Sequence, residues 1–410
     1  MSVLRAPGLR IELAKDGQKL VMIDAKEAQY EIPCRMTNAN ASEYRKLLKR
    51  ALDQLKDSGR KDNLTVKDAA KALGDLARTG RTLIWQIFCA DRKNCDRVSE
   101  IFQQSFPAWL SQREPVILTI STSELSSFIP LEFLPLFDFS EWLKIDDWES
   151  LEAAARRFPG FSAVIRREFS DLRVSQNLVL ENEPKLPLKC FYYRNLKQAE
   201  AEISFFKRNA GARGCFDFDG PWPNRKYDNT EFCASLARHL RSANRRFNGK
   251  YRDAVDQIQH FICHCEIDED LSSESRLLFS DGNTASIGDL QAAFLTIEER
   301  KESQDGPLVF LNACGTSRID PMAIASFPRF FLQDNSNRGF IGTETNVPDV
   351  FAAEFSQSFY RGLLQGLSVG QALYNAKWEM LQNKNNPLGM LYVVYADPDL
   401  HLSKRIKNVN

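Results

Sequence analysis

A cysteine and a histidine each stand just past the end of an apolar run, an arrangement that could support nucleophilic catalysis. The run at 307–312 is rich in branched and aromatic residues and is followed by Cys314 and a glycine. The run at 258–262 is followed by His264, fifty positions before Cys314. An imidazole, with an unperturbed pKa of about 6.5, can take a thiol proton at neutral pH, and the thiolate is the reactive form. The pattern predicts Cys314 as a nucleophile and His264 as its base.

The elements that must position these two residues have the pattern of a parallel sheet. Short apolar runs that stop at glycine or polar residues are typical of strands buried on both faces. From residue 188 onward such runs alternate with amphipathic helical patterns, which is the order of βα units. Ligands of open α/β sheets bind outside the carboxyl ends of the strands, so we expect His264 and Cys314 at one edge. We expect strands at 188–193, 215–218, 258–266, 307–312, 339–343 and 390–395, a hairpin arm at 276–282, and helices at 199–208, 229–247, 287–295, 323–332 and twice after 349.

The first part of the chain has a mixed pattern. Strands are expected within 1–40 and at 115–120 and 163–166, and helices at 42–57, 66–77 and 149–157; Ser42 is the expected N-cap of the first helix, and 83–88 is expected to be helical. The polar stretch 181–187 contains two prolines and favours a domain boundary. We therefore expect an α+β lobe at 1–183 and an α/β domain at 184–410.

Composition excludes several classes of protein. The 410 residues carry 54 basic and 54 acidic side chains, and a net charge of zero argues against a protein whose main partner is nucleic acid. No apolar run approaches the length of a membrane span, and residues 1–8 lack a signal-peptide core. These features favour a cytoplasmic protein whose nine cysteines are reduced.

The other histidines and cysteines have simpler interpretations. The chain has four histidines; His260 lies within its strand and is expected in the core, while His239 and His401 lie away from any strand-end cluster. A zinc site at residues 263–265 is disfavoured because successive strand residues point to opposite faces. We expect Cys89 and Cys95 to pack in the interior. Taken alone, Cys314 and His264 could likewise be buried structural residues.

Several segments together resemble the CHAT family, which comprises caspase-like proteases of clan CD and is related to caspases and separase. The residues Phe-Ile-Cys-His-Cys at 261–265 resemble the family's strand that ends in the catalytic histidine. The residues Leu-Asn-Ala-Cys-Gly-Thr at 311–316 resemble its nucleophile strand. Segments at 340–349 and 359–373 are similar to the family's C-terminal pattern, and 129–134 is similar to its Pro-Trp-Glu-Leu-Leu element, with Leu131 in place of tryptophan.

The resemblance implies a fold and a mechanism. The fold would be a caspase-like three-layer α/β sandwich with a central, mostly parallel sheet, preceded by a regulatory or degenerate caspase-like lobe. The site would be a Cys–His dyad of Cys314 and His264, without cofactor or metal. The oxyanion hole would be formed by the backbone N–H groups of Cys314 and Cys265. Relatives usually have glycine at the second position, and the Cβ of Cys265 restricts the backbone there.

The implied function is a cysteine endopeptidase that cleaves a specific protein target in bacterial defence or cell death. A gasdermin-like protein is one kind of substrate, and an activator would act through the first lobe. Asp281 and Glu344 are candidate substrate-pocket residues that would favour a basic side chain before the scissile bond; a small residue is the other expectation. Two alternatives stay open: a non-catalytic interaction scaffold, and a ligase or transpeptidase that passes the acyl group to an amine.

Overall fold

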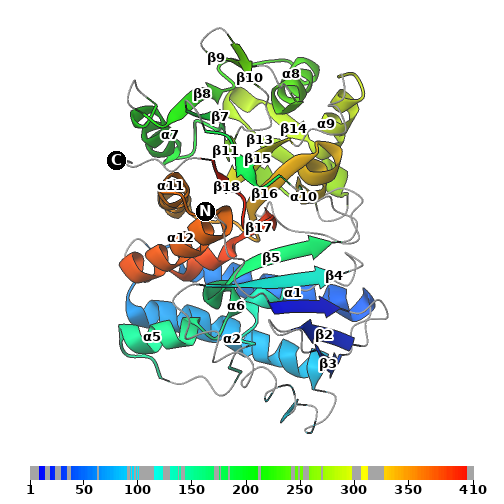
Figure 1. Cartoon of the computed structure of the whole chain (residues 1–410), viewed down its shortest axis with the longest axis vertical. Coiled ribbons are helices and arrows are strands. Elements are labelled where there is room, and N and C mark those ends of the chain that lie inside the picture. The colour runs from blue at the N-terminus through cyan, green and yellow to red at the C-terminus, as the bar shows by residue number, and fades with distance from the viewer. Residues whose placement is uncertain are drawn as a thin grey trace. The chain divides into compact units, whose positions relative to one another are not determined.

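The structure is a computed structural model of the whole chain, shown in Figure 1. It describes residues 9–13, 19–23, 29–34, 38–61, 64–89, 93, 95–96, 98, 100, 115–122, 130–136, 138–139, 144–169, 175, 177–182, 185–210, 214–241, 245–247, 250–252, 258–268, 271–297, 306–312 and 327–403. Within these ranges every helix is too short or too polar to cross a bilayer. Cys314, Ile129 and the expected helix residues 323–326 lie outside the described residues.

The chain divides into two compact units. The first comprises residues 1–171 and 373–391, and the second residues 172–372 and 392–410. Helix α12 (Val369–Lys384) belongs to the second unit up to Ala372 and to the first from Leu373 onward. The first unit therefore takes up a segment from late in the chain. The boundary that we expect between residues 183 and 184 stays a prediction, as does a regulatory role for residues 1–183.

The first unit is built on a mixed five-stranded sheet in the order β3-β2-β1-β4-β5. Strand β1 pairs in parallel with β4, and β4 with β5, while the first three strands are antiparallel. These strands are β1 (Leu9–Leu13), β2 (Lys19–Ile23), β3 (Gln29–Pro33), β4 (Val116–Thr122) and β5 (Ala163–Phe169). Its helices include α1 (Asn38–Ser58), α2 (Val66–Phe88), α5 (Trp148–Ala155) and α6 (Pro159–Ser162), with short turns η2 (Leu131–Phe133) and η7 (Pro387–Leu391).

Local signals explain most of these helices. Thr65 caps α2 in a reciprocal capping box with Asp68, and the apolar run at 83–88 continues α2, as expected. The first helix begins at Asn38, so the expectation that Ser42 caps it is wrong. The preceding Asn-Ala-Asn-Ala residues extend the helix, since alanine has the highest helix propensity.

The core of the first unit contains buried charge. The guanidinium of Arg167 on β5 pairs with the carboxylate of Glu132 in η2, and both side chains are 1% exposed. The ammonium of Lys377 on α12 donates to the carbonyl of Gly160, and burial lowers the pKa of Lys377 to about 8. Trp378 donates its indole N–H to the carbonyl of Phe161. These bonds attach the late segment 373–391 to α6 within this unit.

The second unit is built on a six-stranded sheet in the order β17-β16-β15-β11-β7-β8. Only β17 is antiparallel to its neighbour; every other pair is parallel. The strands are β7 (Leu186–Tyr192), β8 (Phe216–Trp222), β11 (Ile258–Ile262), β15 (Gly306–Asn312), β16 (Asn337–Thr343) and β17 (Tyr392–Ala396). All residues of β7, β11, β15, β16 and β17 are buried, which is typical of strands covered on both faces and agrees with their mainly apolar sequences.

Helices cover both faces of this sheet (Figure 1). On one face the His260 ring of β11 contacts Phe206 of α7, at 4.9 Å between centroids. On the other face the next residue, Phe261, contacts Phe331 of η6 at 5.9 Å. The helices are α7 (Ala199–Arg208), α8 (Asn229–Arg241), α9 (Ile287–Phe294), α10 (Phe327–Arg329), η6 (Phe330–Asp334) and α11 (Asp349–Leu364), with α12 beginning here. The expected three-layer α/β fold with a mostly parallel central sheet is confirmed.

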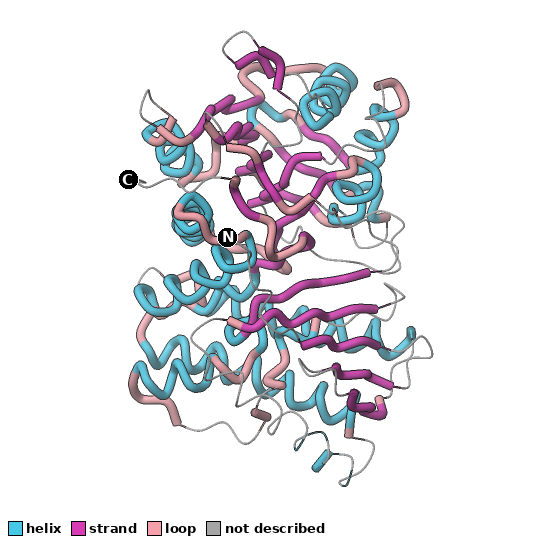
Figure 2. Tube along the Cα trace, viewed as in Figure 1, coloured by secondary structure: helices cyan, strands magenta, loops and turns pink. Residues whose placement is uncertain are grey.

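Small sheets flank the central one, and two of them correct our expectations. The run 258–266 is not one strand: β11 ends at Ile262, and β12 (His264–Glu266) pairs with β13 (Arg276–Leu278), which pairs with β14 (Thr284–Ser286). The expected helix 229–247 ends at Arg241, and β9 (Arg245–Phe247) pairs with β10 (Lys250–Arg252). Residue periodicity does not determine which neighbour a segment pairs with. The remaining elements are β6 (Val179–Leu180) paired with β18 (His401–Leu402), and the turns η4 (Ser272–Glu274) and η5 (Ser280–Gly282). Figure 2 shows the secondary structure along the whole trace.

The cysteines are not all reduced. Cys89, at the end of α2, forms a disulfide with Cys95, with the two Cα atoms 4.6 Å apart. The expectation that both pack as separate thiols is therefore wrong. Six positions separate the two cysteines in the sequence, and no spacing motif identifies the pair.

Candidate active site

The central sheet brings two strand ends to one edge. Strands β11 and β15 are parallel neighbours, and their register places Ile262 opposite Asn312 as the last pair. His264 follows Ile262 by two positions, and Cys314 follows Asn312 by two positions in the sequence. The structure describes His264 but not Cys314, so the contact that we expect between their side chains stays a prediction.

His264 stands at the start of β12, where the chain has left the central sheet. Its ring is half-buried and packs edge-on against Tyr193, with 5.2 Å between the ring centroids. Backbone pairing of His264 with Leu278 holds β12 in the small antiparallel sheet. A ring that is packed on one side and accessible on the other can be oriented and still exchange protons.

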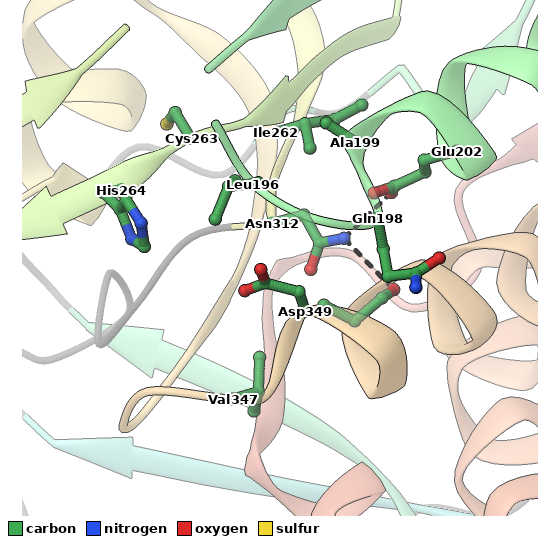
Figure 3. A pocket seen from close by; sticks show the side chains of 11 residues that line it. Leu196, Gln198, Ala199, Glu202, Ile262, Cys263, His264, Asn312, Val347 and Asp349 are labelled. Carbon is green, nitrogen blue, oxygen red and sulfur yellow. Dashed lines mark hydrogen bonds between the residues drawn. The ribbon is translucent and has the colours of Figure 1, made fainter. Parts of the chain in front are cut away.

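A pocket opens beside His264 (Figure 3). The loop before α7 and the first turn of α7 form one wall, and the segment entering α11 forms another. The ends of β11 and β15 lie between these walls. The lining residues are Leu196, Gln198, Ala199, Glu202, Ile262, Cys263, His264, Asn312, Val347, Asp349 and Ala352. The pocket thus holds the expected base, two carboxylates and two amides.

Asp349 lines the pocket, although the sequence favours a role for it as a helix N-cap rather than as a substrate-pocket residue. It is the first residue of α11, after Pro348 at the N-cap, where the helix dipole stabilises a negative charge. Its Oδ2 atom accepts a hydrogen bond from the backbone N–H of Lys197 at 3.2 Å. The carboxylate points towards the side of the pocket on which His264 lies (Figure 3).

The two predicted substrate-pocket residues lie elsewhere. Asp281 forms an ion pair with Arg194, with 3.1 Å between the oxygen and the nitrogen, so a cation already balances its charge. Glu344 follows strand β16 and is half-buried. Neither is among the described residues that line the pocket. Their role in substrate binding stays a prediction.

Glu202 is the other carboxylate of the pocket, and sequence reasoning missed it. It lies on α7 between Ala199, Ile203 and Phe206, all on the buried face of the helix. A charged residue within the apolar face of an amphipathic helix is a signal that could have identified it. Its side chain is 2% exposed and its Oε1 atom lies 2.7 Å from Nε2 of His260. As expected, His260 is a core histidine, 0% exposed.

Cys265 replaces the glycine that relatives usually have after the histidine. It lies within β12, paired with Leu277, and is partly exposed. Positive φ angles at non-glycine residues of the described chain occur at Asp281, Ser336 and Asn385, and Cys265 is not one of them. Its Cβ therefore causes no backbone strain of the kind that would require glycine. Among the residues described, no group of three or more His, Cys, Asp or Glu side chains is placed to hold a metal ion.

Fold and site together define a caspase-like α/β protein with its pocket at the carboxyl ends of parallel strands. Residues 108–403 match the family model described as the CHAT domain. The chain belongs to the CHAT domain family. The match begins well before the central sheet and includes β4 and β5 of the first unit.

One curated relative matches a part of the chain. A protein of a Vitiosangium species, whose name describes it as a probable protease, is 34% identical over 98 residues. Those residues make up 24% of this chain and 13% of the relative, so most of the relative has no counterpart in the match.

Two solved structures resemble the chain in overall trace. The complex of the pro- and mature domains of Porphyromonas gingivalis RgpB aligns with a TM-score of 0.43 and 10% identity, covering 88% of this chain and 77% of that one. The Saccharomyces cerevisiae separase–securin complex aligns with a TM-score of 0.41 and 10% identity, covering 96% and 30%. At these TM-scores neither likeness carries an argument about chemistry.

Proposed function

We propose that this protein is a cysteine endopeptidase in which Cys314 is the nucleophile and His264 is the acid and base. The observation that carries the proposal is the register of β11 and β15, in which Ile262 lies opposite Asn312. Each partner is followed two positions later by one member of the dyad. Two residues of extended chain span at most about 7 Å, so both members belong to the same short stretch of sheet edge.

The reaction follows acyl-transfer chemistry. His264 takes the thiol proton, and the Cys314 thiolate attacks the scissile carbonyl carbon to form a carbon–sulfur bond. The carbon–nitrogen bond then breaks, and the imidazolium of His264 gives its proton to the leaving amine. In the second half, His264 takes a proton from water and the hydroxide attacks the thioester carbon. The carbon–sulfur bond then breaks, and the imidazolium of His264 returns its proton to the Cys314 thiolate. The backbone N–H groups of Cys265 and Cys314 stabilise the oxyanion in this proposal.

The pocket favours a basic side chain before the scissile bond. Asp349 supplies a carboxylate beside His264, and no lysine or arginine side chain is among the described residues that line the pocket. A partly buried carboxylate such as that of Asp349 attracts an ammonium or guanidinium group of the substrate. Asp281 and Glu344 stay candidates for a wider binding surface.

The biological setting that we propose rests on family resemblance alone. The substrate would be a specific protein in a bacterial defence or cell-death pathway, such as a gasdermin-like pore-forming protein, and the reaction would take place in the cytoplasm. An activator would act through residues 1–183. These parts are separable from the proposed chemistry and need their own tests.

A peptide library incubated with the purified full chain tests the chemistry. We expect cleavage that Cys314→Ala and His264→Ala each abolish, with new C-terminal carboxylates in the products. Products joined to an added amine would indicate a ligase or transpeptidase. Cleavage that survives in Cys314→Ala would refute the proposal. If Cys314 also shows no enhanced reactivity with a thiol probe, the interaction-scaffold alternative is favoured.

A further inference from the structure

A chain of buried polar side chains lies beneath the pocket, in a core that is otherwise aromatic. The Nε2 atom of His260 on β11 is 2.7 Å from Oε1 of Glu202 on α7. The Nδ1 atom of His260 is 3.0 Å from the hydroxyl of Tyr360 on α11. His260 and Tyr360 are fully buried and Glu202 is 2% exposed. Three secondary-structure elements are thus joined through one imidazole.

The direction of these hydrogen bonds follows from Tyr360. Burial, and then the nearby charge of Glu202, raise the pKa of Tyr360 well above 10, so the phenol keeps its proton. The imidazole nitrogen Nδ1 accepts that O–H, because a buried donor without an acceptor would cost its full desolvation energy. The ring proton of His260 then lies on Nε2 and is donated to Glu202. One tautomer of the imidazole is therefore fixed.

Glu202 also accepts a hydrogen bond from Asn312, the last residue of β15. The Nδ2 amide of Asn312 donates to Oε1 of Glu202 at 2.9 Å and to the carbonyl of Ala352 at 3.1 Å (Figure 3). Its Oδ1 atom accepts from the hydroxyl of Tyr392 at 2.6 Å. Both donor hydrogens and the carbonyl oxygen of this amide are engaged. The end of β15 is therefore attached to α7, α11 and β17 at once.

We propose that Glu202, His260 and Tyr360, acting through Asn312, are positioning residues that fix the end of β15 for the chemistry of Cys314. The inference rests on the proposed function, because the chain continues from Asn312 to Cys314 in two positions. Apolar side chains would fill this core without the desolvation cost of four polar groups. A fully satisfied polar network specifies one arrangement where apolar packing would allow several.

Exchanging the hydrogen-bond donor at position 312 and the acceptor at position 202 tests whether the polar network positions the end of β15. In Asn312→Asp the donated hydrogen bond is lost and two buried carboxylates face each other. In the wild type Oε1 of Glu202 accepts from both His260 and Asn312. In the double variant Asn312→Asp/Glu202→Gln, the new amide must turn so that its oxygen accepts from His260 and its N–H group donates to the new carboxylate at position 312. The matched control is Asn337→Asp, because Asn337 is 2% exposed, lies at the other end of the β15–β16 pair and donates to Pro307.

The readout is the rate at which iodoacetamide alkylates Cys314 at pH 7, measured by peptide mass spectrometry. This rate needs no substrate and reports the thiolate that His264 stabilises. We expect alkylation to slow at least about tenfold in Asn312→Asp, since an unassisted thiol has a pKa of about 8.5 and is only a few per cent ionised. Asn337→Asp should alkylate at the wild-type rate. The double variant should recover most of the lost alkylation rate. Recovery should be incomplete because the carbonyl of Ala352 loses the hydrogen bond that Asn312 donates to it.

Several outcomes would overturn the inference. The alkylation rate of Cys314 could be unchanged in Asn312→Asp, it could fall equally in Asn312→Asp and Asn337→Asp, or the double variant could show no recovery of the rate. If Asn312→Asp fails to fold, Tyr360→Phe removes a single oxygen and should slow alkylation several-fold, as expected for one buried hydrogen bond; an unchanged rate there refutes the inference. The variant His264→Ala distinguishes failure of this inference from failure of the proposed function. If Cys314 is alkylated at the wild-type rate in that variant, the proposed dyad is refuted, whatever the asparagine variants show.

Discussion

The carboxylate of Asp349 and the backbone N–H of Lys197 are joined by a hydrogen bond of 3.2 Å. The bond links the segment that enters α7 to the first turn of α11, and both border the pocket that holds His264. It leaves the second carboxylate oxygen of Asp349 to face a ligand.

Asp349→Asn should change specificity rather than folding. The asparagine oxygen can still accept from Lys197, but the negative charge is gone. We expect kcat/KM for peptides with arginine before the scissile bond to fall by about 10- to 100-fold, the range of a charged hydrogen bond worth about 1.5–3 kcal/mol. Fluorogenic peptides that differ only in that residue measure this.

Asp281→Asn is the control for the specificity prediction, because the charge of Asp281 is already paired with Arg194. It should leave the arginine preference close to wild type. A larger effect at Asp281 than at Asp349 would move the specificity site to the region that the sequence suggested. Equal cleavage of peptides with leucine and arginine by the wild type would contradict a charged pocket.

Three thiols should not react with alkylating reagents in the native protein. Cys190, Cys215 and Cys233 are buried, and burial raises the pKa of Cys190 well above 9, that of Cys215 to about 11 and that of Cys233 to about 12. We expect no alkylation of these residues at pH 7 without denaturant and full alkylation in guanidinium chloride, because the thiolate is the reactive form. Native labelling at any of the three would show that the second unit opens locally.

Acid should destabilise the second unit through His239. Burial, and then the charge of Lys189, lower the pKa of His239 to about 4, while an unfolded histidine titrates near 6.5. Between these values the unfolded chain binds more protons. Stability is therefore fully present above pH 6.5 and is lost as the pH falls towards 4, with a slope of up to about 1.4 kcal/mol per pH unit.

A His239→Phe variant checks this pH dependence. The phenyl ring can pack against Trp222, which now lies 4.7 Å from the His239 ring, and it does not titrate. Thermal unfolding of both proteins between pH 4 and 7 should show a shallower slope in the variant. An unchanged slope would assign the acid sensitivity to other groups.

Replacing one partner of the buried ion pair in the first unit should strongly lower the free energy of unfolding of that unit. Glu132→Gln removes the carboxylate that pairs with the guanidinium of Arg167, 1% exposed, and breaking a buried pair from one side costs about 3–5 kcal/mol. Hydrogen exchange of peptides from β4 and β5 during a denaturant titration follows this unit by itself. Glu152→Gln, which removes the partly exposed pair with Arg156, is the matched control and should cost less than about 1 kcal/mol. Similar losses in both variants would contradict the prediction.

The sequence by itself determined most of the local structure and the two residues of the proposed dyad. Mainly apolar runs identified the buried strands, and the helix expected at 287–295 begins at Ile287, where Ser286 forms a capping box with Asp289. Signals of this kind act within a few residues of the chain. They also identified His264 and Cys314 as residues that follow strands, although they did not show that His264 begins a separate strand.

Only the tertiary structure decided which polar side chains meet. Glu202 and Asn312 are 110 positions apart, and His260 and Tyr360 are 100 apart, yet the four share one buried network. Asp349 reaches the pocket because α11 begins there. The disulfide between Cys89 and Cys95 is likewise visible only in the tertiary structure. Periodicity in a sequence determines which face of an element is buried. Periodicity carries no information on which distant element packs against that face. That information comes only from the long-range packing of α7, β11, β15 and α11.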